Sequence, residues 1–158
     1  MLNSRWIGPL LLVAVVSACA TGNTFKDVSP RIPPLPLAQG RLYVYRSGDA
    51  PTTLAPPVSL AGIEVGAGKP ASFFFVDRDP GRYELRVADD AAHALPLKLD
   101  AGQTHYVRLE IRSGLTGDYL VPVDVSEVDS AKEILPLDYS GVPLSKRRIA
   151  RALPLPAP

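Results

Sequence analysis

Apolar and polar side chains alternate along much of the chain between residues 40 and 137. The alternation is clearest in residues 83–87, 105–112 and 119–125, and a period of two is typical of a strand that buries one face. Four further candidate strands are the apolar segments 42–45, 58–65, 72–76 and 95–99. Turns rich in Gly, Pro and Asp separate these segments. Seven short strands at regular spacing predict an all-β fold, a seven-stranded antiparallel β-sandwich.

One short helix is expected near the C-terminal end of this region, over residues 126–135. Ser126 can cap its first turn, and Asp129 follows three residues later, as in a capping box. A type II turn is expected at Asp79-Pro80-Gly81-Arg82, which has proline second and glycine third. The helix and the turn mark where the strand pattern stops and where it reverses.

Two prolines, Pro96 and Pro122, interrupt strand patterns. Proline cannot donate to a ladder, so both strands are expected at sheet edges or at bulges. An edge strand can accept a strand from a partner, although edge prolines more often prevent unwanted pairing.

The first 20 residues have the anatomy of an export signal. Arg5 precedes the apolar residues 7–16 (IGPLLLVAVV), and small side chains follow. Roughly ten apolar residues are too few to span a bilayer, which needs about 20. Val16-Ser17-Ala18-Cys19 resembles the lipobox of bacterial lipoproteins, so residues 1–18 are predicted to be a signal peptide. The alternative is an ordinary signal peptide, cleaved near Ala18 or Ala20, in which Cys19 is incidental.

The lipobox resemblance implies where the protein resides. Processing would make Cys19 the first residue of the mature chain, with a diacylglyceryl group on its sulfur and an acyl chain such as palmitate on its amine. Several acyl chains together anchor a protein durably, because each buried CH₂ contributes roughly 0.8 kcal/mol. Ala20, and not aspartate, follows Cys19, and in lipoproteins of double-membraned bacteria that pattern accompanies transfer to the outer membrane. We expect an outer-membrane lipoprotein that faces the periplasm.

Composition divides the mature chain into three parts. Residues 19–39 carry four prolines and predict an extended tether, residues 40–137 form the sandwich domain, and residues 138–158 predict a flexible tail whose removal leaves the domain's stability unchanged.

Charge is distributed unevenly between these parts. Residues 40–137 carry 10 basic and 14 acidic side chains, whereas residues 138–158 carry four basic and one acidic. The basic side chains of the tail are candidate contacts for anionic lipid headgroups or another polyanion: Lys146, Arg147, Arg148 and Arg151. The alternative is a solvated tail that aids solubility. The domain has no basic run, so nucleic-acid binding is not expected.

Chemistry-bearing side chains form no recognisable catalytic or metal-binding motif in the sequence. His93 and His105 are the only histidines, and a zinc site needs three or four ligands. Asp77 and Asp79 begin like a calcium loop, but Gly81 stands where an oxygen ligand is required. We therefore expect no metal, no cofactor and no enzymatic activity.

Tyrosines are the candidate binding residues. If Leu42 and Val44 face the core, Tyr43 and Tyr45 form an exposed aromatic pair on the same strand, and Tyr106 is a third candidate. Exposed aromatic side chains often mark interfaces, so these three tyrosines are predicted to form a partner surface.

Several segments carry a resemblance to a known family. They are, in chain order, residues 40–46 (GRLYVYR), 63–66 (IEVG), 72–75 (SFFF), 79–83 (DPGRY) and 97–107 (LKLDAGQTHYV). In order and kind they resemble the DUF2846 family of small bacterial lipoproteins, whose function is unknown. The resemblance implies a sandwich like those of PEGA-type and transthyretin-like domains, and it supplies no catalytic residues. The proline-rich stretch 51–57 departs from the family pattern.

The sequence therefore favours a non-enzymatic, membrane-anchored lipoprotein that acts as an interaction or structural module of the envelope, with an unidentified envelope protein as partner. Two alternatives remain open at this point. One is an accessory subunit of a secretion or transport assembly, and the other is a module that binds a small ligand or glycan.

Replacing the candidate lipidation site, Cys19→Ser, is expected to release the protein from membranes or to leave the precursor uncleaved, because serine offers no thiol for the diacylglyceryl group. Membrane fractionation and electrophoretic mobility measure both effects. Unchanged behaviour in both assays would contradict lipidation.

Overall fold

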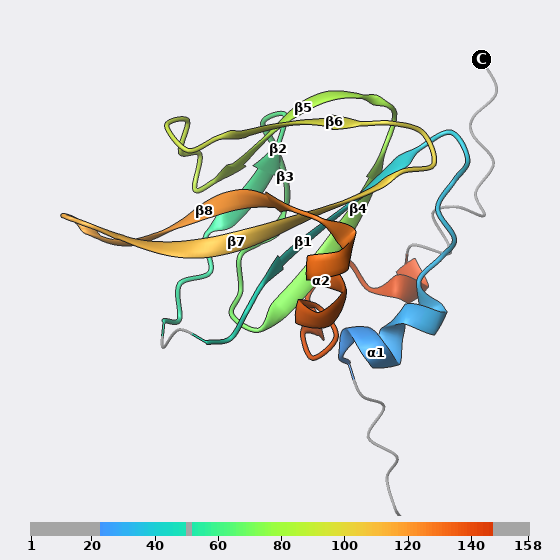
Figure 1. The fold of residues 1–158 in the computed structure, drawn as a ribbon, viewed down its shortest axis with the longest axis horizontal. Coiled ribbons are helices and arrows are strands. Elements are labelled where there is room, and N and C mark those ends of the chain that lie inside the picture. Colours follow the sequence, from blue (N-terminus) through green and yellow to red (C-terminus); the bar gives the residue numbers. More distant parts are fainter. Residues whose placement is uncertain (1–22, 50–51, 147–158) are drawn as a thin grey trace, which may run out of the picture.

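Residues 23–49 and 52–146 are described by a computed structural model, and they form two β-sheets packed face to face (Figure 1). The strands are β1 (Gly40–Arg46), β2 (Pro57–Leu60), β3 (Ile63–Ala67), β4 (Ser72–Arg78), β5 (Gly81–Val87), β6 (Leu95–Leu99), β7 (Thr104–Gly114), β8 (Gly117–Val125) and β9 (Asp138–Tyr139). The helices are α1 (Phe25–Val28), the 3₁₀ turn η1 (Ser29–Arg31) and α2 (Glu127–Glu133). One sheet has the order β8-β7-β1-β4-β9 and the other β3-β2-β5-β6.

The core between the sheets comes from the alternation visible in the sequence. β1 and β4 contribute one face of each strand, β2 and β5 contribute the facing side chains, and β7 and β8 extend the same layer. Its fully buried members include Leu42, Val44, Val58, Leu85 and Leu99. The expectation of an all-β, sandwich-like fold is therefore confirmed.

The expected count of seven antiparallel strands is wrong. Residues 58–65 form a hairpin and not one strand, because Ala61 and Gly62 take positive φ values of 51° and 77° and reverse the chain. Two pairings are parallel, β1 with β7 and β4 with β9. The turn at Asp79-Pro80 is not type II, since Gly81 has no positive φ. It joins strands of different sheets, so it forms a corner instead of a hairpin.

Both prolines lie in edge strands, as expected. Pro96 is in β6 and Pro122 in β8, each at the end of its sheet. The expected helix is also present as α2, and the Ser126 side chain accepts a hydrogen bond from the backbone N–H of Asp129. Among the described residues, no helix is long and apolar enough to cross a membrane.

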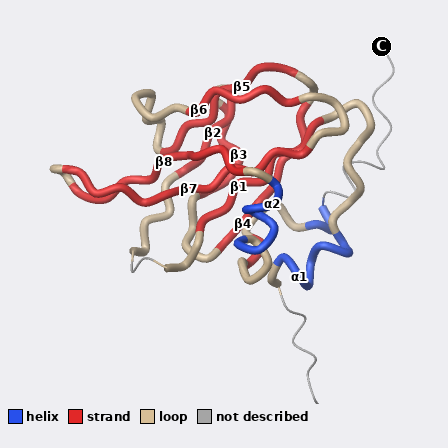
Figure 2. The backbone as a smooth tube through the Cα atoms, in the orientation of Figure 1, coloured by secondary structure: helices blue, strands red, loops and turns tan. Residues whose placement is uncertain are grey.

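The outer face of the five-stranded sheet carries a second apolar layer, and Figure 2 shows the helices beside that sheet. Its buried members come from β1, β4, α1 and the segment after α2: Tyr43, Tyr45, Phe73, Phe75, Val28, Ile134 and Leu137. We call this layer the outer cluster. It exists because β1 and β4 are apolar on both faces, so their outer side chains also need cover.

The expected tether and the expected flexible tail both contribute to this cover, so those two predictions are wrong for the described residues. Val28 is buried in the segment predicted as a tether, and the Phe25 N–H donates to the Leu137 carbonyl. In the predicted tail, β9 pairs with Ser72 and Phe73 of β4, and Leu144 packs against the outer cluster. The sequence pattern did not predict either contribution, because proline-rich segments show no strand or helix period.

We predict that a chain ending at Leu137 unfolds more easily than one ending at Lys146. The shorter chain loses β9 and the Tyr139 ring, which lies 5.4 Å from the Phe73 ring, and leaves the Phe73 carbonyl without its bond from Ser140. Its free energy of unfolding should fall by about 2–4 kcal/mol. Urea unfolding measures the difference, and equal stability of the two chains would show that β9 contributes nothing.

Candidate functional site

The predicted lipidation site and most of the basic tail lie outside the described residues. These are Cys19, Arg147, Arg148 and Arg151. Lys146 is the last described residue, and its side chain is exposed. The predicted roles of all five residues therefore stay predictions.

The prediction that Tyr43 and Tyr45 form an exposed pair is wrong. Their exposed fractions are 6% and 1%, because the outer cluster covers the face on which they lie. Tyr106 on β7 is half-buried and stacks on Tyr43, with ring centroids 5.2 Å apart and an angle of 7° between the rings. Burial raises the pKa of Tyr106 to about 12. The three tyrosines do gather in space, but as packing and not as an open partner surface.

The Tyr45 hydroxyl leads to a polar network at the border of the outer cluster. It donates to Glu133 Oε2 of α2 at 2.6 Å, and Arg108 Nη1 of β7 donates to Glu133 Oε1 at 2.7 Å. Arg108 also pairs with Glu110 at 2.7 Å, and Glu110 pairs with Arg112. Burial, reinforced by the bond to Glu133, raises the pKa of Tyr45, and the bonds to Glu110 and Glu133 raise that of Arg108.

Two open hollows flank this network, with volumes of about 550 Å³ and 460 Å³. Arg108, Lys132 and Glu133 line both of them. Because both carboxylate oxygens of Glu133 accept hydrogen bonds from side chains, this carboxylate serves to hold α2 on the sheet. Sequence reasoning missed the network, although the charged wet face of β7 beside a capped helix was a signal for it.

Two buried arginines lie on β1. Arg41 binds both carboxylate oxygens of Asp77, at 2.7 Å and 2.9 Å, and its guanidinium lies 4.5 Å from the centre of the Phe75 ring. Arg46 is only 2% exposed and donates to the backbone carbonyls of Leu54 and Gly68. Burial lowers the pKa of Arg46. Burial also acts to lower the pKa of Arg41, but the hydrogen bonds and the charge of Asp77 raise it above its ordinary value.

A smaller cavity of about 230 Å³ lies at one end of the sandwich, and we call it the end pocket. Leu54, Val87 and Leu120 supply apolar lining, and Asp90 and Asp118 supply carboxylates. Within the described residues, no three His, Cys, Asp or Glu side chains come together to hold a metal. His93 pairs with Asp90 at 2.7 Å beside this pocket, and its ring lies 5.1 Å from that of Tyr119.

Comparison with known proteins identifies a family. The family described as "Protein of unknown function (DUF2846)" matches residues 37–121, which is 85 of the 158 residues and extends from just before β1 into β8. No curated protein and no solved structure matches the chain. The helices, β9 and the outer cover they form lie beyond the matched range.

The network predicts energetic coupling between Tyr45 and Glu133. Tyr45→Phe and Glu133→Gln should each lower the free energy of unfolding by about 1–3 kcal/mol, and the double variant should lose about 1 kcal/mol less than the sum. Arg112→Ala is the control, because that exposed pair should contribute under about 1 kcal/mol. Chemical denaturation measures all four, and strictly additive losses would show that the hydroxyl and the carboxylate do not interact.

Proposed function

Because the chain belongs to the DUF2846 family, whose function is unknown, we propose its role from its own residues. We propose that it is a non-enzymatic lipoprotein of the bacterial outer membrane, anchored through Cys19 and facing the periplasm. Its sandwich acts there as an interaction or structural module that contacts an envelope protein. A PEGA-type or transthyretin-like relationship of the sandwich is part of this proposal.

The observation that carries the proposal is how soon the chain packs after the candidate lipidation site. Asn23 follows Cys19 by four positions and already bonds to Tyr139, through its side chain and through its backbone carbonyl. Four residues span at most about 14 Å. A lipid on Cys19 would therefore hold the domain close to the bilayer, with α1 nearest to it, and not at the end of a long tether.

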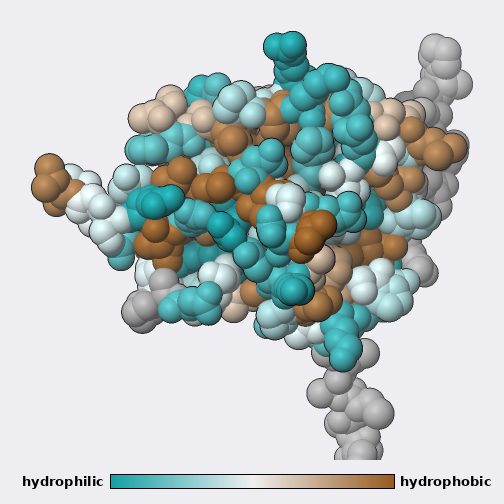
Figure 3. Space-filling view, in the orientation of Figure 1, coloured by the Kyte–Doolittle hydropathy of each residue, from teal (hydrophilic) through white to brown (hydrophobic). Residues whose placement is uncertain are grey.

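One element projects away from that end of the molecule. β1 pairs with β7 only as far as Arg108, so the outer halves of β7 and β8 pair with each other alone and form an arm. Leu115 at its tip is fully exposed, and the tip is apolar in Figure 3. Figure 1 shows the arm at the far end of the long axis from α1. An apolar tip held away from the anchored end suits contact with a partner, including a subunit of a secretion or transport assembly.

A photo-crosslinking amino acid placed in living cells tests this arrangement. At Lys26, an exposed position on α1, it should yield lipid adducts, and at Leu115 it should yield a protein adduct of defined mass. Ile63, an exposed apolar residue on the edge strand β3, is the matched control and should yield less. Combination with Cys19→Ser should remove the lipid adducts.

Two results would contradict the proposal. If lipid adducts persist without Cys19, lipidation of Cys19 does not anchor the protein. If the yield of protein adduct at Leu115 is no higher than at Ile63, the arm is not the element that contacts the partner.

A further inference from the structure

The end pocket opens where the two sheets part at one end of the core. Its floor is made by Val87 of β5 and Leu120 of β8, which belong to opposite sheets and to the same core. Leu54 and Pro56, from the loop before β2, form one wall, and Tyr119 forms another. Leu54 and Tyr119 are 41% and 36% exposed, so apolar surface is open to a ligand at the mouth.

Energetically unfavourable features lie on both sides of the end pocket. Arg46 fixes the loop through the Leu54 carbonyl, yet among the described residues it has no carboxylate partner, and its Nε has no hydrogen-bond partner. A buried cation without a counterion is unfavourable unless its bonds are needed. On the other side, Ala88 and Asp89 both take positive φ, at 51° and 56°, which costs roughly 1–2 kcal/mol for each residue. The loop that carries Leu54 is therefore tied to β1 through Arg46.

Two carboxylates belong to the lining of the pocket. They are those of Asp90 and Asp118, and Asp89 is exposed next to Asp90 in the chain. Ser113 donates to Asp118, and His93 is the titratable side chain that pairs with Asp90. The bond from His93 lowers the pKa of Asp90, so this carboxylate is charged at neutral pH. No Lys or Arg is among the lining residues.

We propose that the end pocket binds an apolar side chain flanked by arginines, and that the C-terminal segment of a second copy of this chain supplies it. The cavity is smaller than the roughly 300 Å³ at which small-molecule sites begin, so it suits a side chain better than a whole ligand. In that segment Ile149 stands between Arg148 and Arg151. The proposed contact also brings together parts of opposite charge, since residues 40–137 have a net charge of −4 and residues 138–158 a net charge of +3.

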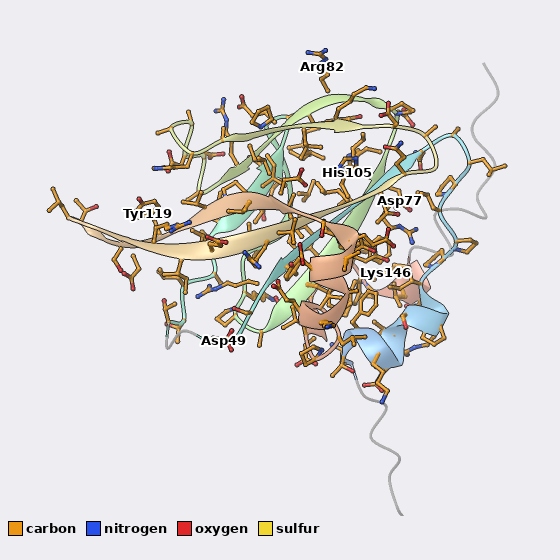
Figure 4. The ribbon with its side chains drawn as sticks, in the orientation of Figure 1. Asp49, Asp77, Arg82, His105, Tyr119 and Lys146 are labelled. Atoms are coloured by element: carbon orange, nitrogen blue, oxygen red, sulfur yellow. The ribbon has the colours of Figure 1, made fainter. Side chains whose placement is uncertain are left out.

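We assign the segment to a second copy because the C-terminal segment of the same copy is too short to reach its own end pocket. Ile149 follows Lys146 by three positions and lies at most about 10 Å beyond it. Figure 4 shows Lys146 on the side of the helices and Tyr119 on the side of the arm. A tail on one copy and a pocket on the next make a head-to-tail contact, which joins copies into a ring or a row.

A labelled peptide of residues 144–155 (LSKRRIARALPL), titrated into the full mature chain with Cys19→Ala and without lipid, tests the pocket. Fluorescence anisotropy should show saturable binding. Asp90→Asn with Asp118→Asn should weaken it roughly fivefold to tenfold, since each exposed ion pair contributes up to about 1 kcal/mol. Asp124→Asn is the matched control, because Asp124 lies on the same strand outside the end pocket. A peptide with Ile149→Asp should not bind.

Sedimentation of the same chain tests the second copy. The mature chain should associate as its concentration rises, and a chain that ends at Lys146 should stay monomeric. Equal peptide affinity of the Asp90/Asp118 and Asp124 variants would overturn the proposal. So would binding of the peptide to phosphatidylglycerol vesicles and not to the protein, which would assign the tail to lipid. None of these results bears on whether Cys19 is lipidated, so the proposed function is tested separately.

Discussion

The two-sided apolar character of β1 and β4 is the constraint on which the rest of the structure depends. Leu42, Val44 and Phe74 face the other sheet, while Tyr43 and Phe73 face outward from the same strands. A strand with two apolar faces needs cover on both, or large aromatic area stays in water. The second sheet covers one face. The other face is covered by segments from both ends of the chain, which explains why α1, α2 and β9 lie together.

This cover decides where the ends of the described chain emerge. Thr24 and Asp138 form a bridge, so the segment that follows the candidate lipidation site and the segment that precedes the basic tail run side by side. The packing leaves the arm away from the helices (Figure 1), and the lining of the end pocket includes no residue of α1 or α2. The fold thus separates an end suited to anchoring from surfaces suited to contact.

The two buried arginines of β1 are held in different ways. Arg41 lies beneath the cover and is neutralised by Asp77, with the Phe75 ring beside it. Arg46 lies at the other end of β1 and binds backbone carbonyls instead. The first arrangement pairs the buried cation with a carboxylate, whereas the second uses an unfavourable buried cation to shape a loop. One strand therefore holds a buried arginine at each end, and each is satisfied in a different way.

The sequence by itself determined what is local. The period of two located most strands, proline marked the two edges, and Ser126 marked the start of α2, because side-chain alternation, a missing donor and a cap act within a few residues. What covers a face is not local. The runs LYVY in β1 and FFFV in β4 are apolar throughout, a sign of burial on both faces, but nothing nearby in the chain says what would cover them. Tertiary structure decided three features: the burial of Tyr43 and Tyr45, the bond from Tyr45 to Glu133 across 88 positions, and the packing of the proline-rich ends. Each depends on segments that come together only when the chain folds.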